Sequence, residues 1–241
     1  MTQTTVVQHK TRASTALIIW RAKIDALVAI WRDAYPPAKP RKHSLIEKLL
    51  CTMVLAVSLV SLSNFKDLYR AKSSNPSRNF MDIYVLSWMA LLSFALFSSR
   101  IPAAIATALA IYRIVDVVDY RLFFLLVKSQ EKPWMADLLR RSIVIALLNF
   151  YEVMTGFAIL YVNTHSIVQV GAPSLPLTTP GSAFYYSMVT MVTLGYGDYV
   201  PATAAGKGLV VAQLSTTVLF LIFLVPALVS VLSPTLTNHK N

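Results

Sequence analysis

Apolar residues in this chain gather into long runs that are separated by short basic or proline-rich stretches. Two runs, at residues 142–162 and 208–232, are each long enough at ~1.5 Å per helical residue to cross a bilayer core of ~30 Å. Shorter runs precede them at residues 49–62 and 83–97. Residues 101–127 are too few for two spans and carry charges, which predicts one long, partly interfacial helix. The pattern predicts an all-α integral membrane protein.

Composition supports a membrane protein and narrows its partners. Hydrophobic residues make up 56% of the chain and charged residues only 14%, unlike an ordinary soluble domain. The net charge of +11 is attributed to positive cytoplasmic loops and anionic lipid headgroups, because no basic module interleaved with aromatics indicates nucleic-acid binding. Cys51 is the single cysteine, so we expect no intrachain disulfide, no metal cluster and no cofactor.

The N-terminal region has a different character from the apolar runs. Residues 14–35 mix aliphatic residues and two tryptophans, Trp20 and Trp31, with charged residues of both signs. This mixture is typical of an amphipathic helix that lies in the membrane interface, and Pro36 and Pro37 end it.

A short amphipathic stretch lies between the two longest runs. Ser182–Val192 has eleven residues, which would make a helix of about 16 Å, half of a membrane. Thr193-Leu-Gly-Tyr-Gly-Asp198 follows it directly. A half-membrane helix followed by irregular backbone predicts a re-entrant loop, which is stable at membrane depth only if protein buries it or it lines a water-filled path.

The two glycines of this motif suggest what the loop does. Glycine adopts positive φ without steric cost, so Gly195 and Gly197, alternating with Leu194 and Tyr196, allow right- and left-handed conformations to alternate. Successive carbonyls can then point the same way, and rings of them around a symmetry axis can replace the water shell of a monovalent cation. A tight turn is the alternative, but a turn between two spans has no need of a preceding half-helix.

The motif closely resembles the signature of potassium channels, and the resemblance extends over residues 142–233 as outer helix, pore loop and inner helix. It implies a homotetramer in which each chain supplies one quarter of the pore. The implied potassium-binding residues of the selectivity filter are Thr193, Leu194, Gly195, Tyr196 and Gly197. The implied support of the filter comes from Asp198, Tyr185, Tyr186 and Thr190.

Departures from the family pattern concern the filter and the gate. Leu194 replaces the usual valine, and its carbonyl still serves. Thr217 stands where many members have a hinge glycine, and Pro226 matches the second proline of the bend in voltage-gated members. Both are gating candidates. A proline kink needed only for packing is the alternative for Pro226.

Charged residues within the apolar segments do not form a voltage sensor of the familiar type. Arg100, Arg113 and Arg121 are 13 and 8 positions apart, not every third residue. The intramembrane acids Asp116, Asp119 and Glu152 have two interpretations, as proton- or ion-sensing groups or as structural partners of the arginines. We favour the structural interpretation.

Orientation follows from the family resemblance, because the filter opens outside. The basic linker 128–141 would then be cytoplasmic, which gives a multi-pass cell-membrane protein with both termini in the cytoplasm. Residues 49–62 and 83–97 would supply the two preceding crossings; the alternative pairs 83–97 with 101–127. The resulting division of the chain is a cytoplasmic region at 1–44, N-terminal membrane helices and linker at 45–135, and a pore domain at 136–241.

The sequence therefore predicts a potassium-selective channel rather than an enzyme, because Ser, His and Asp form no recognisable triad or metal site. A non-selective cation channel is one alternative, against which the intact Tyr196 and Gly197 argue. A subunit of a potassium uptake transporter is another, although such proteins typically carry four loops in one chain and only one is visible here.

Overall fold

The computed structural model describes residues 21, 23–33, 44–60, 79–126 and 136–237. They fall into two compact units, one from residues 1–81 and 119–133 and the other from residues 82–118 and 134–241. Each unit is described by itself. Predictions for residues 14–20 and for most of the 128–141 linker lie outside the described residues.

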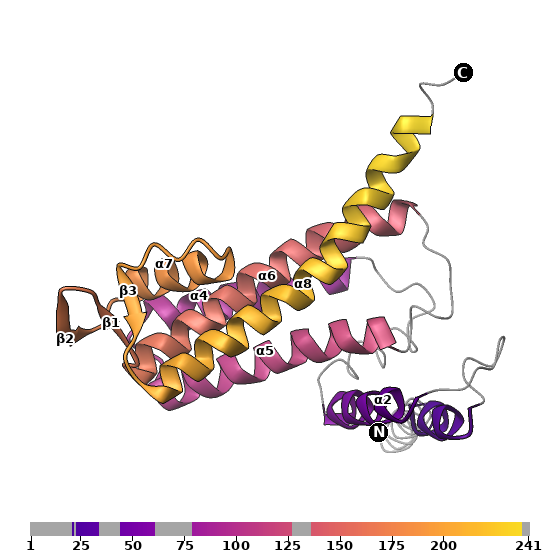
Figure 1. The fold of residues 1–241 in the computed structure, drawn as a ribbon, viewed down its shortest axis with the longest axis horizontal. Coiled ribbons are helices and arrows are strands. Elements are labelled where there is room, and N and C mark those ends of the chain that lie inside the picture. The colour runs from indigo at the N-terminus through magenta and orange to yellow at the C-terminus, as the bar shows by residue number, and fades with distance from the viewer. Residues whose placement is uncertain (1–20, 22, 34–43, 61–78, 127–135, 238–241) are drawn as a thin grey trace, which may run out of the picture. The chain divides into compact units, whose positions relative to one another are not determined.

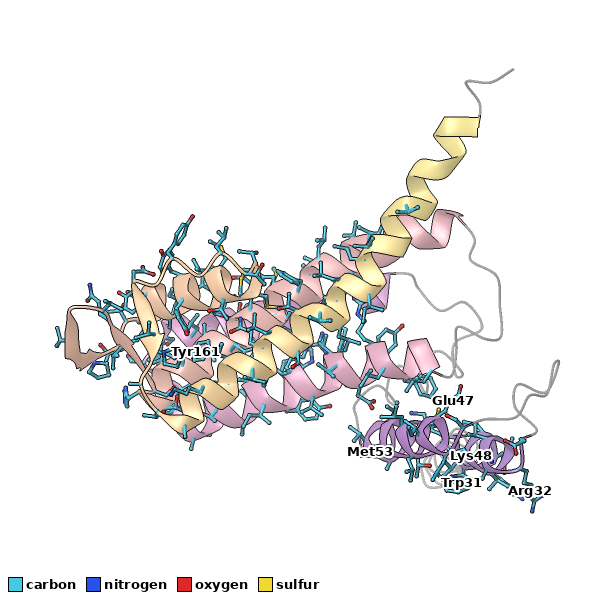
Figure 2. The ribbon with its side chains drawn as sticks, viewed as in Figure 1. Trp31, Arg32, Glu47, Lys48, Met53 and Tyr161 are labelled. Carbon is cyan, nitrogen blue, oxygen red and sulfur yellow. The ribbon has the colours of Figure 1, made fainter. Side chains whose placement is uncertain are left out.

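The first unit contains a pair of helices. Residues 23–31 are helical, in agreement with a helix in the N-terminal region, and α2 spans Leu45–Val60. The Trp31 indole donates to the Thr52 hydroxyl at 3.0 Å, and Lys48 forms an ion pair with Asp33 at 3.0 Å (Figure 2). The opposite face of α2 exposes a stripe of apolar residues, namely Leu45, Ile46, Leu49, Leu50, Met53 and Val57. A face of this kind suits contact with lipid.

Long helices form the second unit. They are α4 (Asn79–Phe97) and α5 (Ala103–Leu126), which both continue into the first unit, and α6 (Ala136–Thr164) and α8 (Ala204–Thr237). Figure 1 shows α6 and α8 side by side along much of their length. Gly156 on α6 permits close contact with α5, because a Cβ there would lie 3.1 Å from the Ile114 side chain. The predicted long helix at 101–127 is confirmed as α5.

Two helices among the described residues are long and apolar enough to cross a membrane, at Ile143–Thr164 and Ala204–Ile222. They coincide with the two longest apolar runs of the sequence. A shorter apolar helix covers Asp82–Phe97. The two long apolar helices that the sequence predicts on either side of the candidate loop are thus present in the fold.

A small sheet corrects the all-α prediction. Strands β1 (Ile167–Gln169), β2 (Ala172–Pro176) and β3 (Tyr199–Pro201) form an antiparallel sheet in the order β2-β1-β3. The strands are only three to five residues long, and β3 is distant in sequence from its partner β1. Alternating patterns need longer stretches than this, so the sequence did not predict the sheet.

A buried cluster of charged side chains in the second unit partly explains why the apolar helix α5 carries charged residues. Arg113 is 1% exposed and contacts Asp116 and Glu152, each at 2.6 Å. Its guanidinium also lies over the rings of Tyr84 and Trp88 on α4, at 5.2 and 5.5 Å from their centroids. The structural interpretation of Asp116 and Glu152 as partners of Arg113 is therefore confirmed.

Candidate pore loop

The short helix predicted to be re-entrant is present as α7, which spans Pro180–Met191 and begins two residues before the predicted Ser182. Its start has clear local causes. Thr179 is the N-cap and accepts a hydrogen bond from the Ser182 backbone N–H at 3.3 Å, and Pro180 occupies the first turn, where its missing N–H costs nothing. At ~1.5 Å per residue this helix is about 18 Å long, too short to cross a bilayer.

The chain leaves α7 through a tight set of backbone hydrogen bonds. The N–H groups of Val192, Thr193 and Leu194 donate to carbonyls of the last helical turn at 2.9–3.0 Å. The acceptor for Thr193 is the carbonyl of Thr190. The predicted support residue Thr190 is thus one of the backbone acceptors that join the end of α7 to the candidate filter.

The backbone of the candidate filter alternates in handedness. Positive φ occurs at every second residue, with 59° at Thr193, 56° at Gly195 and 80° at Gly197. This is the alternation that the two glycines allow. The left-handed backbone at Thr193 was not predicted from the sequence. A non-glycine residue in this conformation stores of order 1–3 kcal/mol of strain. Such strain is typical of functional loops.

The side chains of this loop are open in the single chain. Leu194 is 56% exposed and Tyr196 is 67% exposed, and a Cβ added at Gly195 or Gly197 would meet nothing within 4 Å. A loop at membrane depth has to be covered by protein or to line water. One copy of the chain does not cover it.

Tyrosine side chains of α6, α7 and β3 pack together next to the loop. Tyr186 contacts Tyr161 of α6 edge-on, with ring centroids 5.0 Å apart, and both Tyr185 and Tyr186 lie 6.4 Å from Tyr199. The Tyr185 side chain interacts with the Asp198 carboxylate, so these two predicted support residues lie together. Tyr199 and Tyr161 belong to the same cluster but were not among the predicted site residues.

The sheet fixes the exit of the loop. The Val170 N–H donates to the Asp198 carbonyl at 2.9 Å, and β3 then pairs with β1, with Val168 opposite Val200. The Ala202 N–H donates to the Ser166 carbonyl at 2.9 Å, so the chain is also tied to the end of α6. The sequence predicts a loop in this region, because no local pattern shows that residues around 168 and 200 form paired strands.

The gating candidates both lie on α8. Thr217 is 4% exposed, and its hydroxyl donates to the carbonyl of Gln213 one turn earlier, at 3.1 Å. Pro226 lies within the continuous span of α8. Neither observation tests a role in gating, and both roles remain predictions.

The donor groups of the loop suit an alkali cation rather than a transition metal. Backbone carbonyls and the Thr193 hydroxyl are hard oxygen ligands. Among the described residues, no group of three or more His, Cys, Asp or Glu side chains is placed to hold a metal ion. The loop can therefore offer oxygen dipoles to a permeant ion.

Comparison with known proteins agrees with this geometry. Residues 142–233 match the model of a family described as ion channel. The chain is 50% identical over 48 residues to "Two-pore potassium channel 4" of Arabidopsis thaliana, covering 20% of this chain and 17% of the plant protein. It is 39% identical over 54 residues to "A-type voltage-gated potassium channel KCND3" of Rattus norvegicus, covering 22% and 8% of the two chains.

The matched segments are thus short in comparison with the curated relatives, of whose length less than a fifth is covered. No solved structure matches significantly. The family match nevertheless includes most of α6, the candidate pore loop and most of α8. Residues 142–233 therefore match the ion channel family, and the relatives that the chain resembles in this part are potassium channels.

Proposed function

We propose that this chain forms a potassium-selective channel in which Thr193 to Gly197 line the narrowest part of the pore. The observation that carries the proposal is the alternation of positive φ at Thr193, Gly195 and Gly197. Alternating handedness directs carbonyls to one side of the chain, where rings of oxygen dipoles replace the hydration shell of K⁺. The Thr193 hydroxyl adds a ligand at the inner end.

The pore is a homotetramer in this proposal. One exposed pore loop per chain supports several copies around an axis, and the number four rests on the family resemblance. The inner helix α8 also has a largely apolar exposed surface, which includes Val211, Val218, Leu221, Ile222, Val225 and Val229. Neighbouring copies and lipid would cover this surface.

The membrane topology is part of the same proposal. The chain crosses the cell membrane several times with both termini in the cytoplasm, and anionic lipids contact its basic cytoplasmic segments. The two spans at Ile143–Thr164 and Ala204–Ile222 support an outer and an inner pore helix.

The direct test is the reversal potential of the purified protein in planar bilayers with K⁺ on one side and Na⁺ on the other. Potassium selectivity requires a large reversal potential of the sign set by K⁺. Reversal near zero would indicate a non-selective cation channel instead. Flux that never appears as discrete channel currents would favour a subunit of an uptake transporter.

External block by tetraethylammonium tests the outer mouth. We expect weak block of the wild type, because Val200 lies just before Pro201 at the exit and offers no aromatic ring. Val200→Tyr should strengthen block at least tenfold, since each favourable cation–π contact contributes ~1–2 kcal/mol. Dose–response curves measure this directly. Leu175→Tyr is the control and should leave block unchanged, because Leu175 is exposed on β2, the strand that does not pair with β3.

Gating is tested at Pro226. Pro226→Ala restores a backbone donor in α8 and should change open probability without changing ion selectivity. Single-channel recordings provide the measurement, with Val144→Ala, which is exposed on α6, as the control. An unchanged open probability would leave Pro226 with a packing role only.

A further inference from the structure

Gln213 is an unusual residue for the centre of an apolar membrane helix. Its side chain is 0% exposed on α8. A primary amide at membrane depth is costly unless its donors and acceptor are all satisfied. A buried polar side chain that is satisfied by other helices fixes how those helices pack.

Both polar atoms of the Gln213 side chain form hydrogen bonds with other helices. Its Nε2 donates to the carbonyl and to the hydroxyl of Ser187 on α7, at 2.8 and 2.9 Å. Its Oε1 accepts a hydrogen bond from the Tyr161 hydroxyl of α6 at 2.7 Å. The amide therefore joins the inner helix to the re-entrant helix and to the outer helix at once (Tyr161 is labelled in Figure 2).

Ser187 completes the connection. It is 0% exposed, and its hydroxyl donates to the Met154 carbonyl of α6 at 2.7 Å while it accepts from Gln213. Ser187 lies one turn before Met191, the last residue of α7, after which the candidate filter begins. A displacement at Ser187 would be passed to the loop through the short hydrogen bonds that end this helix.

We propose that Gln213 is a positioning residue for the selectivity filter, because it ties the last turns of α7 to α8. This inference rests on the proposed channel function. Thr217, a gating candidate, donates to the Gln213 carbonyl one turn further along the same helix. Movement of α8 at this level must either carry α7 with it or break the bonds of Gln213, so the inner helix acts on the filter through this amide.

The experiment removes the network one member at a time. Gln213→Leu, Tyr161→Phe and Ser187→Ala delete the amide and each hydroxyl with little change of volume. Thr155→Val and Ser215→Ala are matched controls, since these hydroxyls donate only within their own helices, to Tyr151 and Val211 respectively. Two readouts are measured on each reconstituted tetramer: the K⁺/Na⁺ permeability ratio, and the K⁺ concentration that gives half of the maximal thermal stabilisation.

Gln213→Leu should lower the permeability ratio by on the order of tenfold and raise the half-stabilising K⁺ concentration similarly, because it removes several buried hydrogen bonds at once. Tyr161→Phe and Ser187→Ala should produce smaller changes in the same direction, and the controls none. The double variant Gln213→Leu/Tyr161→Phe should be no worse than Gln213→Leu alone, since both act through one network.

The outcomes separate this inference from the channel function itself. A wild type without potassium selectivity would overturn the proposed function. A selective wild type whose Gln213→Leu, Tyr161→Phe and Ser187→Ala variants keep both readouts would overturn the positioning role alone. Additive effects of Tyr161→Phe and Gln213→Leu would also overturn it. If Gln213→Leu does not assemble, the two hydroxyl deletions decide the question by the same readouts.

Discussion

Gly195→Ala and Gly197→Ala are each expected to abolish potassium-selective conduction. The two glycines have φ of 56° and 80°, where an L-residue with a Cβ pays roughly 1–2 kcal/mol. Thr193 already carries this strain once in each chain. In the proposed tetramer a second strained residue in every copy would multiply the cost, so the loop should relax and its carbonyls should turn away from the proposed ion path.

The cause of this loss is conformational rather than steric. A Cβ at either glycine would meet nothing within 4 Å in the single chain, so crowding by its own neighbours is not the reason. Gly208→Ala is the matched control, because its Cβ also meets nothing within 4 Å but its backbone is helical. Planar-bilayer recordings of the three variants make the comparison. Normal potassium selectivity in both filter variants would mean that the motif is not the filter.

The short helix α7 and the irregular loop after it were predictable because their signals are local. A short apolar stretch, two glycines in a chain that holds only seven, and long apolar runs on both sides lie within one stretch of sequence. The start of α7 was less certain, since Thr179 and Pro180 become informative only when the cap geometry is known. The positive φ of Thr193 could not be predicted from the sequence, because threonine gives no local indication of a left-handed backbone.

The features that were missed depend on contacts between distant parts of the chain. Tyr199 reaches the tyrosines of α7 only because β3 pairs with β1, and the sheet joins residues about thirty positions apart. Gln213 looked like one polar residue in an apolar run, and its partners are 26 and 52 positions away. The charge cluster was easier to predict from the sequence, since Arg113 and Asp116 are three residues apart on one helix face and intramembrane charges require partners.

That cluster gives the second large effect, because Arg113→Met is expected to prevent the channel from assembling stably. The guanidinium contacts Asp116 and Glu152, which are 2% and 0% exposed, so its removal leaves two buried carboxylates without this cation. Breaking a buried pair by removing one partner costs about 3–5 kcal/mol, a large part of the stability of a typical domain. The yield of tetramer in detergent and its thermal midpoint measure the effect. Arg100→Met is the control, since Arg100 is exposed.

Replacing all three charged side chains of the cluster should lower the yield and thermal midpoint of the tetramer far less than replacing Arg113 alone. Arg113→Met combined with Asp116→Leu and Glu152→Leu eliminates every ionised group of the cluster, and apolar replacements of buried ion pairs are often neutral or stabilising. The triple variant should therefore recover most of the tetramer lost in Arg113→Met. Arg113→Lys should fall between them, because it keeps the charge but loses the fork that donates to both acids and lies over Tyr84 and Trp88. A stable Arg113→Met, or a triple variant no better than it, would show that the cluster is not what holds α4, α5 and α6 together.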